Sequence, residues 1–231
     1  MKNNLTEKDI KTINKWAEKY GIKELKINDE KIFNLKQLCI FNTNIKYITA
    51  AIFKITNLKS LSIYCNNLNR LPKEIGDLIK LKELDIISRC LIELPKEIGN
   101  LSNIKKLSIY CENLKQLPKE ICNLINLKKL YIHCENLKSL PNEIEKLTNL
   151  ESIRIECENL KQLPKEIHNL IKLKRFDIDC PNSENFPDGI AKLINLETIY
   201  IRNCNGKLNL QYLIGGIVKL NNLKSLYLDI E

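Results

Sequence analysis

Residues 94–116 read LPKEIGNLSNIKKLSIYCENLKQ, and residues 117–139 read LPKEICNLINLKKLYIHCENLKS. The two stretches are nearly identical, and their Leu-Pro pairs stand 23 residues apart. The same step recurs from Leu71 to Phe186, which replaces the leucine before its proline. A fixed period of this length predicts a stacked array, in which each unit buries its apolar face against its neighbours.

Each unit is numbered here from the Leu of its Leu-Pro pair, which is position 0. Weaker units begin at Leu25 and Ile48, and the last unit, at Leu213, follows a step of 27 residues, which indicates a four-residue insertion around Cys204–Tyr212. Positions 13, 15 and 17 alternate with polar or aromatic neighbours, as in a strand with one buried face. The strands are expected to centre on Leu38–Ile40, Leu61–Ile63, Leu84–Ile86, Leu107–Ile109, Leu130–Ile132, Ile153–Ile155, Phe176–Ile178, Ile199–Ile201 and Leu226–Leu228. Since each unit has room for one strand, the strands should be parallel and form an array roughly 40 Å long, at ~4.8 Å per strand.

The segment that returns from one strand to the next begins with L-P-K-E-I-x-x-L. Its apolar residues at positions 0, 4 and 7 have helical spacing. Its proline has a preset φ and no amide proton to lose. The segment is too short for more than one or two turns, so it predicts short α or 3-10 helices on the side opposite the strands.

The pattern LxxLxLxx(N/C)xL within a 23-residue unit resembles the leucine-rich repeat family, and the form LPKEIxxLxxLxxL is similar to its bacterial members. The resemblance covers residues 25–231. It implies an α/β solenoid, a curved horseshoe with a parallel β-sheet on its concave face and short α or 3-10 segments on its convex side. It also implies that the concave face binds a partner.

One position departs from the family pattern. The asparagine that usually stands three residues after the last strand leucine comes one residue later here, at position 19, as in Asn67, Asn113 and Asn136. We expect an altered turn in which this asparagine row still holds the turn amides.

Nine cysteines, an odd number, favour reduced thiols over a disulfide framework. Five of them continue the inward alternation at position 17 and are expected to pack as small apolar residues: Cys65, Cys111, Cys134, Cys157 and Cys180. Strand spacing alone leaves disulfides between neighbouring coils open, whereas closely spaced Cys or His pairs of the zinc-binding kind are absent from the sequence.

The two ends of the array carry different signals. Residues 6–20 predict a capping helix, with Thr6 and Asp9 as a capping box, an apolar stripe that includes Trp16, and Gly21 as its stop. We assign residues 1–24 to this cap and residues 25–231 to about nine repeats. Leu25 and Ile27 are expected to add a short extra strand.

The last strand should leave one edge unpaired. Self-association through this edge stays open, and Asp229 and Glu231 are interpreted as an acidic tip that protects it.

The outward strand positions 14 and 16 line the expected concave face. An aromatic stripe in the first half is followed by mixed charge in the second, and Tyr and Arg dominate binding hot spots. The candidate partner-binding residues are Phe41, Tyr64, Tyr110, Tyr131, His133, Arg154, Glu156, Asp177, Asp179, Tyr200 and Arg202. The alternative interpretation is that these side chains only pack against one another across the strands.

Catalysis is not expected. His133 stands near carboxylates, but nothing in the sequence marks a nucleophile, an oxyanion hole, a metal site or a phosphate-binding loop. The sequence therefore predicts a non-enzymatic scaffold that binds a protein partner and uses no cofactor or metal.

The net charge of +9 is attributed to lysine rows at positions 2, 11 and 21 that flank the sheet. Nucleic acid is a disfavoured partner, because a nucleic-acid binder concentrates lysines on one face beside stacking aromatics. A polyanion binder, and the recognition domain of a larger effector or signalling enzyme, stay as alternatives.

No apolar run in the sequence reaches the ~20 residues of a membrane span, and the start lacks the apolar core of a signal peptide. We expect a cytoplasmic protein, with secretion by a dedicated effector apparatus left open.

Overall fold

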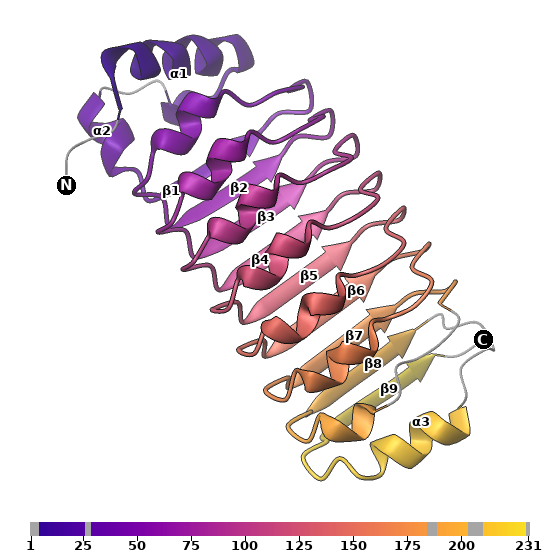
Figure 1. Ribbon diagram of the computed structural model, residues 1–231. Helices are drawn as coiled ribbons and strands as arrows, with labels where there is room; N and C mark the ends of the chain where they lie inside the picture. The colour runs from indigo at the N-terminus through magenta and orange to yellow at the C-terminus, as the bar shows by residue number, and fades with distance from the viewer. Residues whose placement is uncertain (1–4, 26–28, 184–188, 203–209, 230–231) are drawn as a thin grey trace.

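The computed structural model describes residues 5–25, 29–183, 189–202 and 210–229. Nine strands form one parallel sheet in which the strand order follows the sequence (Figure 1). They are β1 (Gln37–Phe41), β2 (Ser60–Tyr64), β3 (Glu83–Ile87), β4 (Lys106–Tyr110), β5 (Lys129–His133), β6 (Ser152–Glu156), β7 (Arg175–Asp179), β8 (Thr198–Arg202) and β9 (Ser225–Asp229). Every predicted strand centre lies inside one of them, so the predicted α/β solenoid is confirmed.

The register of the sheet repeats the period of the sequence. Leu107 lies opposite Leu130, its counterpart in the next coil. The last two strands keep the same alignment although the chain that connects them is longer than in the other coils. Ile199 lies opposite Leu226. Most of the predicted insertion lies outside the described residues. It leads into α3 (Leu210–Ile217), which replaces the 3-10 helix of the other coils.

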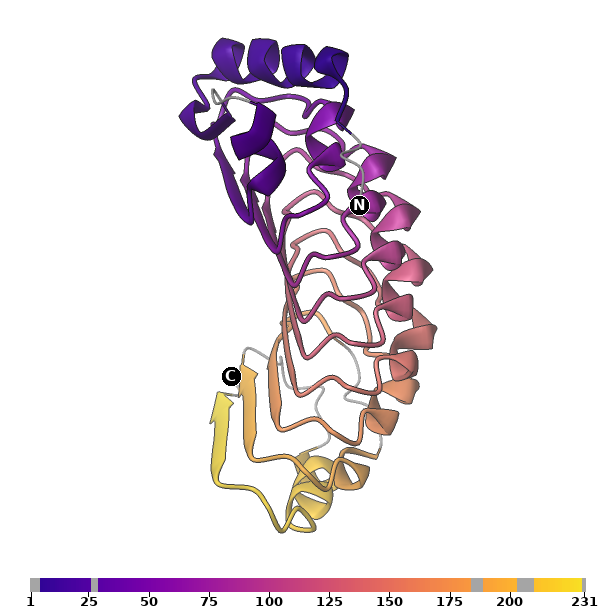
Figure 2. The same cartoon turned by 90° about the vertical axis from the view of Figure 1, so that its left-hand side faces the viewer.

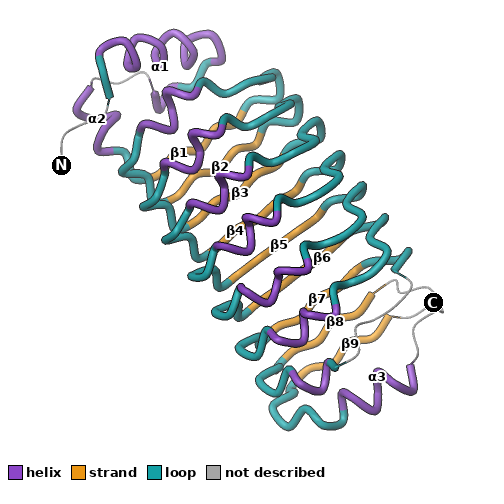
Figure 3. Tube along the Cα trace, viewed as in Figure 1, coloured by secondary structure: helices purple, strands orange, loops and turns teal. Residues whose placement is uncertain are grey.

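Short 3-10 helices return the chain along the convex side (Figures 2 and 3). They are η2 (Ala50–Lys54), η3 (Lys73–Asp77), η4 (Lys96–Asn100), η5 (Lys119–Asn123), η6 (Asn142–Lys146), η7 (Lys165–Asn169) and η8 (Ile190–Lys192). The proline of the repeat precedes η3 with φ at −62°, which suits a helix start. The return segments are therefore 3-10 helices, one of the two forms expected.

The core is a continuous spine of leucine, isoleucine and cysteine between the sheet and the 3-10 helices. Leu107 and Ile109 are fully buried, and the five position-17 cysteines are buried free thiols, as predicted. Burial raises the pKa of Cys111 to about 12, because the thiolate would lose its hydration. Cys39 is exposed on the outward side of β1, and Cys204 lies outside the described residues.

The position-19 asparagines join successive coils, so the expectation that they hold the turn amides is wrong. Asn67 donates through Nδ2 to the carbonyl of Thr43 at 2.7 Å, and Asn113 does the same to Arg89 at 2.8 Å. A second ladder, which the sequence analysis missed, stands at position 9. There Asn126 donates to the carbonyl of Ser102 at 2.8 Å in the preceding coil.

Helix α1 (Glu7–Tyr20) covers the first end of the solenoid (Figure 1). Its capping box is present as predicted: the Thr6 side chain accepts from the Asp9 amide, and the Asp9 carboxylate accepts from the Thr6 amide at 2.9 Å. Gly21 ends the helix in a left-handed conformation with φ at 69°, which favours glycine. Trp16 is buried and donates through its indole nitrogen to the Tyr47 carbonyl at 3.1 Å.

The expected extra strand after the cap is wrong for Leu25, which ends the 3-10 helix η1 (Lys23–Leu25), while Ile27 lies outside the described residues. The short helix α2 (Asp29–Asn34) then leads into β1.

At the other end of the solenoid, no strand within the described ranges pairs with the outer edge of β9. Leu226 is 44% exposed there, whereas its counterparts in the other coils are buried. Asp229 ends β9, and Glu231 is outside the described residues.

Candidate functional site on the concave sheet

The strands line the inside of the curve, as the side view shows (Figure 2). Because the coils are in register, side chains at the same position form rows that run across the strands along the solenoid. Position 16 brings Phe41 beside Tyr64 and Tyr110 beside His133. Position 14 brings Tyr131 beside Arg154. The structure thus places all the predicted residues on one face of the sheet.

The first half of this surface carries the aromatic stripe, which is Phe41, Tyr64, Tyr110 and Tyr131. Phe41 is 70% exposed and lies edge-on to Tyr64, with ring centroids 6.5 Å apart. Tyr110 is 37% exposed, and its ring centroid is 6.0 Å from that of His133. These rings stand on a fully packed core, so a partner would meet them at little further cost in ordering.

The second half carries the charged cluster, which we define as His133, Arg154, Glu156, Arg175, Asp177, Asp179 and Arg202. Glu156 is its first centre: His133 Nδ1 lies 2.9 Å from Glu156 Oε2, and Arg154 Nε donates to Glu156 Oε1 at 2.8 Å. Arg202 also reaches Glu156 Oε1, at 3.1 Å. One carboxylate therefore joins three strands, β5, β6 and β8.

Asp177 is the second centre of the charged cluster. Its side chain is only 3% exposed, and Arg202 donates to its Oδ1 at 3.0 Å. Arg175 donates to its Oδ2 at 3.2 Å, and Arg154 Nε lies 3.7 Å from the same oxygen. A buried carboxylate is stable only when it is paired, and these arginines supply the pairing.

The electrostatics of Glu156 follow from this geometry. Burial alone would raise its pKa, but hydrogen bonds from His133 and Arg154 outweigh the burial and hold the pKa below its ordinary value. The hydrogen bond to Glu156 raises the pKa of Arg154. The arginine–carboxylate pairs thus stay charged and present fixed guanidinium planes to the concave space.

The structure brings Arg154, Glu156, Asp177 and Arg202 together. These residues differ in whether a partner could reach them. Asp177 is too deeply buried to contact a partner, so it positions arginines that are 29–44% exposed. Asp179 takes a marginal place, with Arg202 Nε 4.0 Å from its Oδ2. Tyr200 lies beside Tyr227, with ring centroids 6.0 Å apart.

Arg175 is the member of the charged cluster that sequence reasoning missed. Its guanidinium carbon lies 4.7 Å from the centre of the Tyr200 ring, in a cation–π contact. The signal was present in the sequence, because Arg175 stands two residues before Asp177 and so shares its face of the strand.

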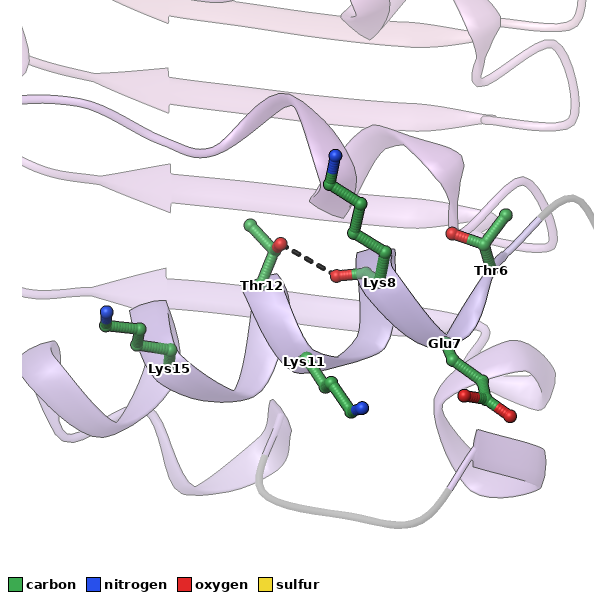
Figure 4. Close-up of a pocket in the computed structure, with 6 residues that line it drawn as sticks. All are labelled: Thr6, Glu7, Lys8, Lys11, Thr12 and Lys15. Carbon is green, nitrogen blue, oxygen red and sulfur yellow. Dashed lines mark hydrogen bonds between the residues drawn. The ribbon is translucent and has the colours of Figure 1, made fainter.

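Other parts of the described chain offer little chemistry. The described residues contain no group of three or more His, Cys, Asp or Glu arranged to hold a metal ion. His168, the second histidine, lies in η7 on the convex side, 3.3 Å from Lys192 Nζ. A shallow hollow runs along α1, but its lysines Lys8, Lys11 and Lys15 point in different directions (Figure 4).

The comparisons with known proteins agree with the repeat pattern found in the sequence. A family model described as a leucine-rich repeat region matches residues 15–138 and 115–231, which together span most of the chain. The chain belongs to the leucine-rich repeat family. Leucine-rich repeat domains commonly bind proteins and are typically non-catalytic.

Two solved leucine-rich repeat structures show the same solenoid. The leucine-rich repeat protein LIC12759 of Leptospira interrogans is 27% identical with a TM-score of 0.68, over 87% of this chain and 58% of that one. The leucine-rich repeat domain of the type III effector XopL is 22% identical with a TM-score of 0.67, over 97% of this chain and 89% of that domain. This chain therefore spans little more than half the length of the first structure. None of the curated proteins compared with this leucine-rich repeat chain matches it.

No helix among the described residues of this leucine-rich repeat chain is long and apolar enough to cross a lipid bilayer.

Proposed function

We propose that this leucine-rich repeat chain is a non-catalytic scaffold that binds a protein partner on its concave sheet, between Tyr64 and Arg202. The observation that carries the proposal is the aromatic stripe, which stands on a rigid sheet beside paired arginines. In this stripe Phe41 and Tyr110 are exposed, and Tyr64 and Tyr131 are half-buried. Tyrosine and arginine supply large contact areas at low entropy cost. The reduced cysteines fit a cytoplasmic location, which is part of the proposal.

The test uses the chain as an immobilised bait in the source lysate, with captured proteins identified by mass spectrometry. The double variant Tyr110→Ala and Tyr131→Ala removes the half of the aromatic stripe on β4 and β5. Tyr47→Ala removes an aromatic ring that is 51% exposed but lies outside the nine strands. We expect the double variant to lose the partner by tenfold or more in affinity, since a hot-spot truncation costs ~2 kcal/mol or more.

Tyr47→Ala should bind the partner as the wild type does, and all three proteins should melt at similar temperatures. A confirmed partner that bound the double variant with unchanged affinity would show that the aromatic stripe is not the site.

A second candidate is the recognition domain of a larger effector or signalling enzyme. The likeness of the fold to the leucine-rich repeat domain of a type III effector, and the partial coverage of the Leptospira protein, favour it. A reading frame in the gene that extends well past Glu231 would support this candidate, and a stop codon directly after it would remove it.

A further inference from the structure

One lateral edge of the solenoid consists of the short turns that connect each 3-10 helix, and α2 and α3 at the ends, to the following strand. These turns form a row along the lower left side of the molecule in Figure 1. With the first residue of each strand, they occupy positions 8–12 of the units. The segments are 33–37, 56–60, 79–83, 102–106, 125–129, 148–152, 171–175, 194–198 and 221–225, and the first of them includes the last two residues of α2.

The whole net charge of the chain is concentrated in these segments. They contain twelve Lys and Arg and three Glu, and no Asp. The rest of the chain contains equal numbers of the two signs, 25 Lys and Arg and 25 Asp and Glu. The corresponding turns on the opposite edge, after β1 to β6, are nearly balanced, with six basic and four acidic residues in 43–47, 66–70, 89–93, 112–116, 135–139 and 158–162.

Apolar side chains stand in the same turns. Position 8 holds Ile79, Ile125, Ile171 and Ile194, each between 52% and 59% exposed. A single exposed isoleucine is ordinary, but these four occupy one slot and so lie in one row among the lysines. Ser102 and Thr148 fill the slot in two intervening coils, which shows that the fold does not require an apolar residue there.

The backbone of this edge is held from within, which leaves the side chains to face outward. Asn149 donates to the Ile125 carbonyl at 2.8 Å, and Asn195 donates to the Ile171 carbonyl at 2.7 Å. The Lys105 amide donates to the Lys82 carbonyl at 2.7 Å. The side chains of Lys59, Lys82, Lys105 and Lys174 are exposed, and within the part of the chain described here they make no ion pair.

We propose that this edge, which we call the Lys/Ile rim (positions 8–12 of the units), binds the surface of an anionic lipid bilayer. Lysines are attracted to anionic headgroups, and isoleucines that stand among them reach the boundary between headgroups and acyl chains. A nucleic acid would use the lysines but would leave the isoleucine row exposed. Single strands also need exposed stacking aromatics, whereas Phe33, the aromatic residue of the rim, is partly buried against the core. The bilayer is the occupant that uses both rows.

The geometry separates this surface from most of the concave sheet, with which it shares Arg175 of the charged cluster. The rim is a lateral edge, whereas the strands that carry the aromatic stripe line the inside of the curve (Figures 1 and 2). A chain that lies on its rim therefore keeps the concave sheet open to a protein partner. Membrane binding and partner binding can then fail independently of each other.

The test is sedimentation of the protein with vesicles of phosphatidylcholine alone and of phosphatidylcholine mixed with phosphatidylglycerol. A charge variant of the rim carries Lys82→Gln, Lys105→Gln and Lys174→Gln, and a matched control carries Lys115→Gln, Lys138→Gln and Lys161→Gln from the opposite edge. An apolar variant carries Ile79→Ser, Ile125→Ser and Ile171→Ser, which copies the natural Ser102.

We expect binding to the anionic vesicles and not to the neutral ones. The charge variant should bind about a hundredfold more weakly, at about fivefold for each lysine near the surface. The control should change much less, although its net charge is the same, and the apolar variant should lose binding several-fold. Tyr110→Ala with Tyr131→Ala should leave vesicle binding unchanged.

Three results would overturn the proposal: no binding to anionic vesicles at low salt, equal losses in the charge variant and its control, or an apolar variant that binds like the wild type. Rim-dependent binding of single-stranded RNA, in the absence of vesicle binding, would assign the rim to a nucleic acid instead.

Discussion

At the scale of single residues, Asp177 decides how the charged cluster is built. It is nearly buried, and the arginines of β6, β7 and β8 surround it. Without its charge, these guanidinium groups would repel one another and would lose the acceptor that fixes their direction. The side chain is therefore a structural anchor for contacts that other residues make.

Asp177→Asn should lower the free energy of unfolding by about 1–3 kcal/mol, because hydrogen bonds to a charged group are lost while the shape is kept. Asp179→Asn is the control, since the Asp179 side chain is 23% exposed and lies 4.0 Å from Arg202, and its effect should be smaller. Urea denaturation measures both values. Equal effects of the two substitutions would contradict the anchoring role.

Glu156 should make stability depend on pH. Its pKa in the folded state lies below its ordinary value of about 4.3. Its stabilising contribution is therefore complete above that ordinary value and is lost as the pH falls through the lower folded pKa. The difference in unfolding free energy between wild type and Glu156→Gln should be larger at pH ~5 than below pH ~4. Denaturation curves over this range measure it, and a difference that did not shrink would contradict the pairing.

At the scale of elements, α1 shows how the solenoid protects an end. The helix buries Trp16 over the first coil, and Lys54 of η2 pairs with Asp9 of α1 at 2.8 Å. The ion pair and the capping box share the same carboxylate, so the start of the helix and its docking depend on one residue.

Thr6→Ala should cost about 1 kcal/mol of stability, because the Asp9 amide loses its acceptor. Thr12→Ala is the matched control, since the Thr12 hydroxyl only donates to the Lys8 carbonyl on the exposed side of the same helix. Thermal unfolding followed by circular dichroism compares the two variants. A Thr12→Ala variant as unstable as Thr6→Ala would show that general helix propensity, rather than the cap, sets the loss.

The elements also show what could be predicted from the sequence. The strands were predictable because identical units must bury identical positions, which places Leu107 and Leu130 opposite each other. Leu25 was misassigned because its apolar spacing also fits a 3-10 turn, and only packing under α1 decides between the two. The asparagine ladders join different coils, so a pattern within one unit does not reveal their acceptors. Arg175 was missed because its partners lie on its own strand and the next one, and side-chain directions decide which of them it reaches.

At the scale of the whole molecule, the place of a coil in the stack determines how much its core residues contribute to the free energy of unfolding. Leu107 in β4 has a neighbouring coil on each side and is fully buried, whereas Leu226 at the same position of β9 is 44% exposed. The repeated core thus weakens toward the unpaired edge.

Leu107→Ala should lower the free energy of unfolding by ~2–5 kcal/mol, as buried leucine deletions do. Leu226→Ala should cost about 1 kcal/mol or less, since much of its side chain already contacts water. Chemical denaturation at equal protein concentration compares the two. Equal losses would mean that the end coil is covered in solution.

The constant register has a consequence for inheritance. Each strand pairs with the next at equivalent positions of the repeat, and the segments 94–116 and 117–139 have nearly the same sequence. Genetic recombination between such copies would add or remove one complete coil. Removal of 117–139 would bring β4 against β6 with leucine still facing isoleucine. Descendants of this gene can therefore grow longer or shorter in whole coils, and the span of the surface they offer to a partner changes with them.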